Sequence, residues 1–273
     1  MVDSKKENPE FDRNASEYNR SRPTYPSSLI DDLIHVAHLD DSSKILEVGM
    51  GTGQLTRSLA DRKLSVTAVE MGKNLVDVAK IKFSEFPEIE IIEGNFEKIV
   101  LKQVYDAVIF ATSFKWIDPE LRVQKVKEVL KKDGILAIID THHAMGGDRK
   151  FFTESQDCYL RWRSGTSPDY RLPEIPEVHP KRWERETQNY FETIFSGTYQ
   201  LEISYTSSEY RRLLSTYSDI LSMGKSKRDQ LLDCISTLID SEFNGKIRKL
   251  YLFELFVAKK KPVSIQSNID GQK

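Results

Sequence analysis

The residues best suited to chemistry form a glycine-rich loop, Glu47-Val-Gly49-Met-Gly51-Thr-Gly53, between a short apolar run and a helical pattern. Glycine permits sharp turns and lets a ligand approach the backbone, because it has no Cβ atom. A phosphate-binding P-loop needs lysine after its last glycine, and here Gln54 follows. A dinucleotide fingerprint counted from Gly49 would need glycine at that same position. Both phosphate-centred interpretations are therefore disfavoured.

A third ligand, S-adenosylmethionine (SAM), suits the loop better. SAM carries no phosphate, so its loop requires neither a lysine nor a pyrophosphate-binding helix end. It does carry an amino-acid head group and a cationic sulfonium, and the carboxylate of Glu47 suits that positive charge. The alternative is a tight strand-to-helix turn without a ligand, but the spaced glycines and the acid exceed what a turn requires.

Polar residues follow the next two apolar segments as well. Glu70 ends a β-branched run, where its carboxylate can accept hydrogen bonds from both hydroxyls of a ribose. NAD-binding folds use such a carboxylate too, so Glu70 does not separate the two cofactors. Asn95 can bond an adenine amine, and Phe96 can stack on the ring; the alternative is a polar turn beside a core phenylalanine.

Candidate acceptor-site residues follow the fourth and fifth apolar segments. Trp116 lies in the stretch Thr112-Ser-Phe-Lys-Trp, and its alternative role is packing against a helix. His142 and His143 form a pair in which either residue could act as a general base. No third ligand stands at a recognisable spacing, so we expect no metal, and a solvated or hydrogen-bonded pair is the favoured interpretation.

Strand and helix patterns alternate through the first half of the chain. Apolar strands joined by amphipathic helices predict a parallel, doubly wound sheet that binds ligands beyond the carboxyl ends of its strands. The expected strands are 44–48, 65–69, 89–92, 105–111 and 135–140, and the expected helices are 54–62, 74–84 and 119–131 with Leu121, Val126, Val129 and Leu130 facing inward.

The second half is less regular and predicts a cap followed by the last strands. Strand-like patterns cover 195–205 and 251–258, and helical patterns cover 207–217 and 227–243. The expected organisation is an N-terminal segment closing over the cofactor site, a core, a cap or substrate insertion, a part completing sheet and cap, and a disordered tail. Their expected bounds are 1–26, 27–141, 142–191, 192–262 and 263–273.

Composition narrows the functional classes. The 273 residues carry 40 Lys plus Arg and 42 Asp plus Glu, for a net charge of -2, which disfavours a nucleic-acid binder. Apolar runs are too short for a membrane helix, and the first residues lack the apolar segment of a signal peptide. Cys158 and Cys234 lie far apart in sequence, so we expect no disulfide framework and a protein of the reducing cytoplasm.

Taken together, these segments resemble the class I SAM-dependent methyltransferases over roughly residues 11–141. ILEVGMGTGQLT, VTAVEMG, EGNFE and YDAVIFATSFKWID are similar to four of the family's motifs, in order. The opening FDRNASEYNRSRPTYP and the ending of the chain resemble a small-molecule branch that includes trans-aconitate methyltransferase-like enzymes. This likeness implies a Rossmann-like fold, α/β, with a seven-stranded mostly parallel sheet, its last strand antiparallel, and an inserted helical cap.

The resemblance also implies residue roles. The three loop glycines would cradle the methionine part of SAM, the second motif would hold the ribose, and the third would flank the adenine. Ala111 would line the pocket through its backbone, while Tyr18 and Arg22 would close it. Many relatives have His before Trp116, where this chain has Lys115, so a role of that histidine cannot be transferred. The candidate cofactor-binding residues are Tyr18, Arg22, Glu47, Gly49, Gly51, Gly53, Glu70, Met71, Asn95, Phe96 and Ala111.

The implied reaction is transfer of a methyl group from SAM to a small-molecule acceptor. A carboxylate acceptor would need no general base, whereas an oxygen or nitrogen of higher pKa would need one. An NAD-dependent oxidoreductase and a non-catalytic SAM-binding protein are the alternatives, and Gln54 argues against the first. The acceptor, its reacting atom and the oligomeric state stay open.

Overall fold

The structure is a computed structural model that describes residues 15–178 and 183–262. The expected tail 263–273 and the first 14 residues of the expected N-terminal segment lie outside the described residues. Within the described ranges, no helix is long and apolar enough to cross a membrane.

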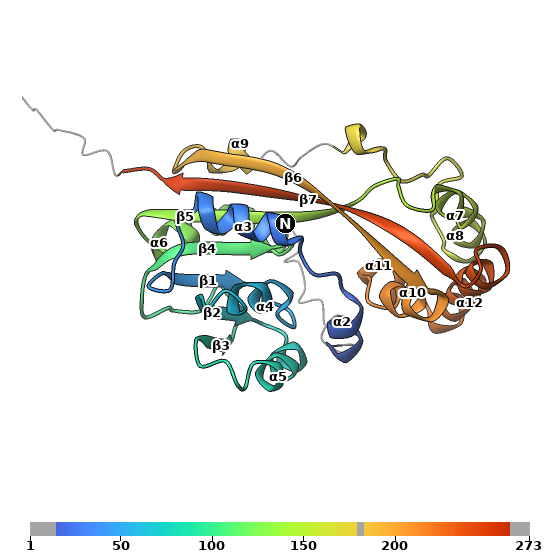
Figure 1. The fold of residues 1–273 in the computed structure, drawn as a ribbon, viewed down its shortest axis with the longest axis horizontal. Coiled ribbons are helices and arrows are strands. Elements are labelled where there is room, and N and C mark those ends of the chain that lie inside the picture. The colour runs from blue at the N-terminus through green and yellow to red at the C-terminus, as the bar shows by residue number, and fades with distance from the viewer. Residues whose placement is uncertain (1–14, 179–182, 263–273) are drawn as a thin grey trace, which may run out of the picture.

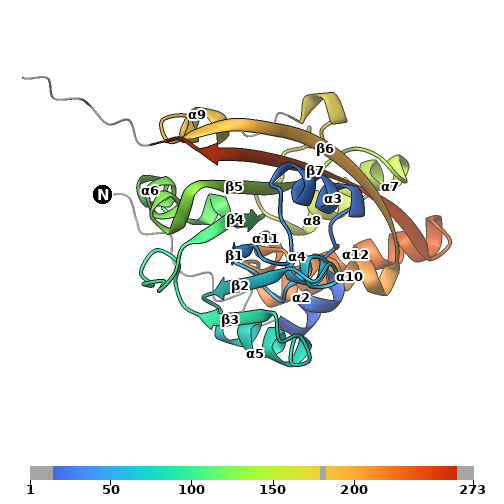
Figure 2. The same ribbon diagram turned by 60° about the vertical axis from the view of Figure 1, so that its left-hand side comes forward.

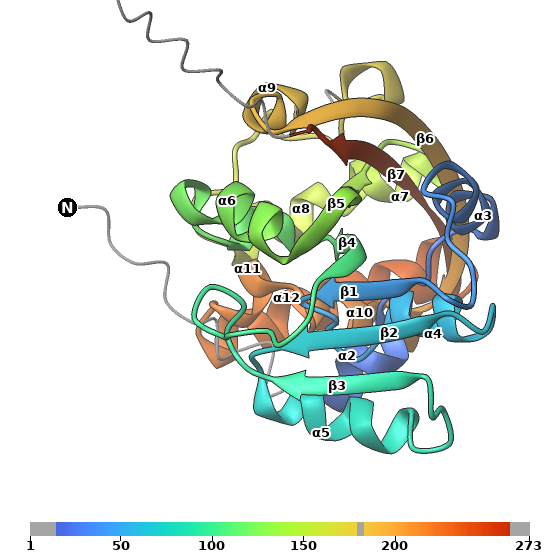
Figure 3. The same ribbon diagram turned by 90° about the vertical axis from the view of Figure 1, so that its left-hand side faces the viewer.

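One seven-stranded sheet with the order β3-β2-β1-β4-β5-β7-β6 organises the chain (Figure 3). The first five strands pair in parallel, and β7 pairs antiparallel with both β5 and β6. The winding reverses between β1 and β4, where such folds bind their ligands. The predicted doubly wound fold is therefore confirmed. The strands are β1 (Lys44–Val48), β2 (Ser65–Glu70), β3 (Ile89–Glu93), β4 (Tyr105–Ala111), β5 (Leu130–His143), β6 (Phe191–Thr206) and β7 (Lys246–Lys260).

Helices cover both faces of this sheet. Leu33, Leu59 and Ala79 bring α3, α4 and α5 onto one face, while Val126 and Trp183 bring α6 and α9 onto the other. Burying both faces suits strands that read as continuous apolar runs. The helices are α2 (Ala15–Ser21), α3 (Ser27–Val36), α4 (Gln54–Ala60), α5 (Lys73–Lys82), η1 (Phe114–Trp116), α6 (Pro119–Val129), α7 (Arg149–Glu154), α8 (Gln156–Trp162), η2 (Ile175–Glu177), α9 (Trp183–Thr187), α10 (Ser207–Leu214), α11 (Ser218–Leu221) and α12 (Lys225–Glu242).

The long strands β6 and β7 carry the cap. They extend past the carboxyl ends of the parallel strands, where α10, α11 and α12 join them (Figures 1 and 2). Local signals support this arrangement, since Thr206 and Glu209 form a capping box that begins α10 as β6 ends. Helices α7 and α8 complete the cap from the segment after β5, and α2 packs against α10 and α5. The cap therefore faces the edge of the sheet at which a ligand is expected.

Several predicted bounds were wrong around β5. The strand begins at Leu130 and ends at His143, because it pairs with β4 at one end and with β7 to its last residue. The preceding helix therefore stops at Val129, and Leu121 is 48% exposed although it was expected inside; Arg122 and Val123 are buried instead. The strands expected at 195–205 and 251–258 are longer because β6 and β7 pair along their whole length.

The two cysteines form a disulfide, although no disulfide framework was expected. Cys158 of α8 and Cys234 of α12 are 76 residues apart in sequence, and their Cα atoms are 5.8 Å apart. Sequence separation misled the prediction, because α12 packs against α8 in the folded cap. The bond lies within the cap and joins its two sequence segments.

Candidate cofactor and acceptor site

The glycine loop lies between β1 and α4, at the reversal point of the sheet. Gly49, Gly51 and Gly53 all have positive φ angles, of 73°, 59° and 81°. A Cβ atom at Gly49 would meet Ser113 at 2.6 Å, and one at Gly53 would meet the Phe83 ring at 2.3 Å. These two glycines are required by packing alone. At Gly51, the nearest atom belongs to the Tyr18 ring at 3.3 Å, so this glycine borders the space beneath the N-terminal helix.

Glu70 ties the end of β2 to this loop. One carboxylate oxygen accepts from the backbone nitrogen of Gly51 at 2.9 Å, and the other accepts from Met71 and Gly72, each at 2.9 Å. The side chain is only 8% exposed. Backbone donors on both oxygens orient the carboxylate at the carboxyl edge of the sheet, which is where an acid that recognises a pair of hydroxyls must lie.

Glu47 lies deeper than the sequence indicated. It is 1% exposed within β1, and its carboxyl group accepts a hydrogen bond from the Thr56 hydroxyl at 2.7 Å. Burial, opposed by this bond and reinforced by the charge of Glu70, raises the pKa of Glu47 to about 8. Glu47 therefore holds α4 against β1 as a largely protonated acid near neutral pH.

Lys82 contacts the glycine loop, and the sequence analysis did not predict this contact. It occupies the last turn of α5, and its ammonium donates to the backbone oxygens of Thr52 at 3.0 Å and Gly53 at 3.2 Å. Burial lowers its pKa. Nothing in the sequence indicated that this end of α5 meets the glycine loop.

After β3, the Asn95 side chain bonds to the backbone of its own turn and the Phe96 ring is buried. The Asn95 side-chain oxygen accepts from the Glu97 backbone nitrogen at 2.7 Å, which forms a tight turn. The Phe96 ring is buried against Phe110, with ring centroids 5.8 Å apart. This burial favours the core role that was weighed for Phe96, so Asn95 is left as the candidate adenine contact.

Thr112 marks the carboxyl end of β4 with an unusual backbone. Its φ angle is 63°, which a β-branched residue rarely adopts. Its nitrogen donates to the Ile139 oxygen at 2.7 Å, and its hydroxyl lies 3.2 Å from that of Thr141 and 3.4 Å from that of Tyr25. Such strain is concentrated at functional sites in proteins. A cluster of three hydroxyls, Tyr25, Thr112 and Thr141, therefore lies directly after Ala111.

Helix α2 covers this edge from the N-terminal side. The Arg22 guanidinium lies 4.9 Å above the Tyr18 ring centroid and 4.6 Å from that of Tyr217, and it donates to the Thr216 oxygen at 2.8 Å. Tyr18 in turn covers Gly51. The structure thus brings Tyr18 to the glycine loop, while Arg22 joins Tyr18 to Tyr217 and Thr216 of the cap.

The two adjacent histidines point to opposite faces of the sheet, since neighbouring strand residues alternate. His142 Nε2 lies 2.7 Å from a carboxylate oxygen of Glu254, whereas the His143 ring lies against Tyr217 and Tyr251 at 5.4 and 5.7 Å. The pair cannot share a metal ion in this arrangement. Among the described residues, no cluster of three or more His, Cys, Asp or Glu side chains could hold one.

Trp116, the remaining acceptor candidate, lies half exposed on η1. Its neighbour Phe114 is buried and packs edge-on against Trp183 at 4.9 Å. The packing role weighed for both residues therefore applies to Phe114. Trp116 stays a prediction as an acceptor contact.

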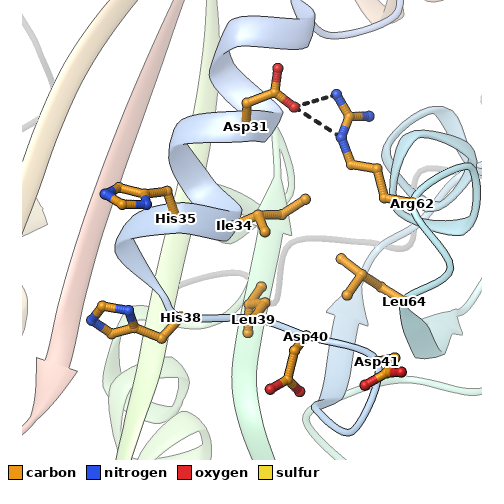
Figure 4. A pocket seen from close by; sticks show the side chains of 9 residues that line it. All are labelled: Asp31, Ile34, His35, His38, Leu39, Asp40, Asp41, Arg62 and Leu64. Carbon is orange, nitrogen blue, oxygen red and sulfur yellow. Dashed lines mark hydrogen bonds and ion pairs between the residues drawn. The ribbon is translucent and has the colours of Figure 1, made fainter.

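A surface groove lies elsewhere, between α3 and the segment that precedes β2 (Figure 4). Its volume is about 520 Å³, and an ion pair between Asp31 and Arg62 spans one side. The groove borders Leu39 and Leu64, just before β1 and β2 begin, so it lies at the opposite edge of the sheet from the glycine loop. Its position is unsuited to chemistry at the carboxyl edge.

Comparison with known proteins places this geometry in a family. A model described as "Methyltransferase domain" matches residues 46–138, which hold β1 through most of β5. A malonyl-[acyl-carrier protein] O-methyltransferase of Acetivibrio thermocellus is 28% identical over 77% of this chain and 76% of its own length. The chain therefore carries a methyltransferase domain, and its likeness is to the class I SAM-dependent methyltransferases.

Other relatives agree with this assignment. An uncharacterised methyltransferase of Mycobacterium tuberculosis is 34% identical over 45% of this chain, and the match spans about half (48%) of the Mycobacterium protein. SAM-dependent methyltransferases of Geobacter sulfurreducens and Thiobacillus denitrificans, both solved with S-adenosylhomocysteine, share the fold with TM-scores of 0.52 and 0.50. They are 13% and 12% identical, each over 92% of this chain and 98% of its own.

SAM is the cofactor of this methyltransferase. The residues present fit it, because Gly51 has no Cβ atom against the Tyr18 ring and Glu70 holds an oriented carboxylate beside it. The predicted likeness to class I enzymes and the expected cofactor are thus confirmed. The finer placement beside trans-aconitate methyltransferase-like enzymes stays a prediction.

Proposed function

We propose that this enzyme methylates a carboxylate oxygen of a small-molecule acceptor. The hydroxyl cluster at the end of β4 carries the proposal: Tyr25, Thr112 and Thr141 are neutral groups at the place where cofactor and acceptor should meet. Burial raises the pKa of Tyr25, so this phenol stays protonated and cannot take a proton from an acceptor. A carboxylate fits this environment because it is already ionised at neutral pH and needs no base.

A similar relative adds independent support. The Acetivibrio thermocellus protein is named for O-methylation of a malonyl group, which carries a carboxyl group. A second such enzyme, from Halalkalibacterium halodurans, is 32% identical over 36% of this chain. These names favour an oxygen acceptor, and they make a carrier-bound acyl group the main alternative to a free small molecule.

We assign cofactor contacts from position. The loop glycines and the buried Glu47 behind them would border the methionine part, and Glu70 with the Met71 backbone would hold the ribose. Asn95 would meet the adenine. Ala111 would line the wall beside it, and Tyr18 and Arg22 would close the site.

The reaction needs little from the protein beyond positioning the acceptor and excluding water from the site. SAM supplies an electrophilic methyl group; the new C–O bond forms as the C–S bond breaks, and sulfur retains the electron pair. Negative charge on the carboxylate and positive charge on sulfur both disappear, so excluding water favours the step. Tyr18 and α2 lie where they would exclude it, and hydroxyls such as that of Thr112 would orient the acceptor.

We further propose that the expected chain divisions have functional meaning. Segment 1–26 would close the cofactor site, and 27–141 would form the SAM-binding core. Segment 142–191 would act with the helices of 192–262 as the acceptor-binding cap.

The test is methyl transfer from isotopically labelled SAM to a panel of small carboxylic acids, amines and phenols, with a malonyl group on acyl carrier protein as a further acceptor. We expect labelled esters, which mild alkali hydrolyses to labelled methanol. An alkali-stable labelled amine or ether would contradict carboxylate methylation. Ester formed only on the carrier protein would contradict a small-molecule acceptor, and SAM binding without transfer to any acceptor would favour a non-catalytic SAM-binding protein.

A further inference from the structure

A lysine on β7 is buried among aromatic rings. Lys249 of β7 is 4% exposed, and its ammonium lies over the rings of Phe152, Tyr210 and Tyr251 at 5.0, 5.9 and 5.5 Å from their centroids. None of the ion pairs found within residues 15–178 and 183–262 includes it. Lysine is almost never fully buried without a partner anion, because removing its charge from water is costly.

His143 faces the same region. It pairs in register with Tyr251, two residues along β7 from Lys249, so both side chains lie on one face of the sheet. In the described part of the chain, its buried Nδ1 atom has no hydrogen-bond partner. A buried polar nitrogen without a partner is costly, and such atoms call for an explanation in a ligand or water.

The charged groups around His143 are basic. Burial and then the charges of Lys249 on β7, Arg22 just after α2, His142 on its own strand and Lys115 on η1 lower its pKa well below the usual value. Burial also lowers the pKa of Lys249 to about 8. Both shifts have burial as their main cause, so positive charge is disfavoured at this site.

The remaining walls offer hydroxyl groups. The hydroxyls of Tyr205 and Tyr251 lie 3.0 Å apart, and Tyr217 adds a third ring against His143. Tyrosine hydroxyls can donate hydrogen bonds to an anion, and their rings exclude water around it. The region between β5, β7 and α11 therefore combines basic nitrogens with phenols.

We propose that Lys249 and His143 bind a carboxylate of the methyl acceptor other than the one that is methylated. This inference rests on the proposed function and makes the acceptor a dicarboxylate. The reacting oxygen itself would be poorly placed there, because a cation stabilises a carboxylate most before its charge disappears in the transition state. A permanent anion is instead an anchor that Lys249 stabilises equally throughout the reaction.

The test titrates the protein loaded with S-adenosylhomocysteine with malonate, succinate and glutarate, and with their half-amides, which lack one charge. We expect at least one dicarboxylate to bind at least about tenfold more tightly than its half-amide. Lys249→Met, which keeps the side-chain volume, should abolish that preference, and His143→Gln should reduce it. At pH 8, binding should take up protons in the wild type and fewer in Lys249→Met, which calorimetry in two buffers measures.

Two controls separate binding from folding. His142→Gln changes the neighbouring histidine on the opposite face and should bind dicarboxylates as the wild type does. The affinity for S-adenosylhomocysteine should stay within about twofold in every variant, because neither Lys249 nor His143 borders the glycine loop. A loss of cofactor affinity in Lys249→Met would assign these residues to the cofactor and overturn the proposal.

The outcomes separate the two proposals. Dicarboxylates that bind but are never esterified would leave the anchor site standing and defeat carboxylate methylation. Esters formed equally well by wild type and Lys249→Met would keep the proposed function and defeat the anchor. A wild-type enzyme that shows no preference for any of the three dicarboxylates over its half-amide would also overturn the anchor.

Discussion

The carboxylate of Glu70 lies 2.9 Å from the backbone nitrogen of Gly51, so the last residue of β2 is hydrogen-bonded to the loop that follows β1. The two segments are neighbours only through the parallel pairing of β1 with β2. One acid therefore both shapes the glycine loop and lies beside it, as the proposed ribose contact requires. Every proposal about the cofactor depends on this arrangement.

Replacing Glu70 should weaken cofactor binding. Glu70→Ala removes charge-assisted acceptors, so we expect the dissociation constants of SAM and S-adenosylhomocysteine to rise by about 10- to 100-fold. Glu93→Ala is the matched control, because Glu93 lies next to Glu70 in the sheet register but is exposed. Calorimetric titration measures both variants. An unchanged dissociation constant in Glu70→Ala would remove this residue from the site.

Gly51 offers a test of the space beneath Tyr18. Gly51→Val should block cofactor binding and leave the circular dichroism spectrum nearly native; the φ angle of 59° should cost stability of about 1–3 kcal/mol. Gly224→Val is the control, since a Cβ atom there meets nothing within 4 Å and φ is −58°. A Gly51→Val protein that binds SAM with native affinity would show that the loop has been misinterpreted.

Glu47 should make stability depend on pH. Its pKa in the folded protein, about 8, lies above the ordinary value of 4.5, so the folded state binds more protons between these limits. The contribution of Glu47 is fully present below pH 4.5 and is lost as pH rises through 8. Glu47→Gln keeps an acceptor for Thr56. At pH 8.5 its free energy of unfolding, measured with urea, should exceed that of the wild type by about 1–3 kcal/mol, and the difference should be smaller at pH 5.5. Equal gaps at both pH values would contradict a buried, protonated Glu47.

The cap disulfide should add stability. Cross-linking Cys158 and Cys234, 76 residues apart, restricts the unfolded chain and should stabilise the oxidised protein by about 2–4 kcal/mol over the reduced protein. Urea unfolding with and without reductant measures the difference, and Cys234→Ser should behave like reduced wild type. Thiol labelling of both cysteines in unreduced, unfolded protein would show that the bond does not form.

The sequence predicted the parts of the fold that local patterns encode. Tyr105–Ala111 was predicted with its observed bounds, because a near-continuous apolar run between turns is typical of a buried parallel strand. The glycine loop was also predicted at its observed place, and each of its glycines adopts a positive φ angle there. Long-range pairing was less visible: nothing local showed that β5 continues to His143 beside Tyr251.

Burial also separated residues that looked equivalent in sequence. His142 and His143 are adjacent, yet strand alternation sends one to Glu254 and the other to the basic cluster near Lys249. Lys249 carried no motif at all, and only the packing of aromatic rings around it distinguishes it from surface lysines. Contacts of this kind depend on the return of β7 through the sheet, which composition and spacing do not encode.

The most direct test of the central claim is a crystal structure of the enzyme with S-adenosylhomocysteine. We predict that the ribose hydroxyls lie within hydrogen-bonding distance of the Glu70 carboxylate and that the homocysteine part passes over Gly51. Adenosine bound anywhere else, or a loop blocked by the Tyr18 ring with the ligand present, would contradict the account.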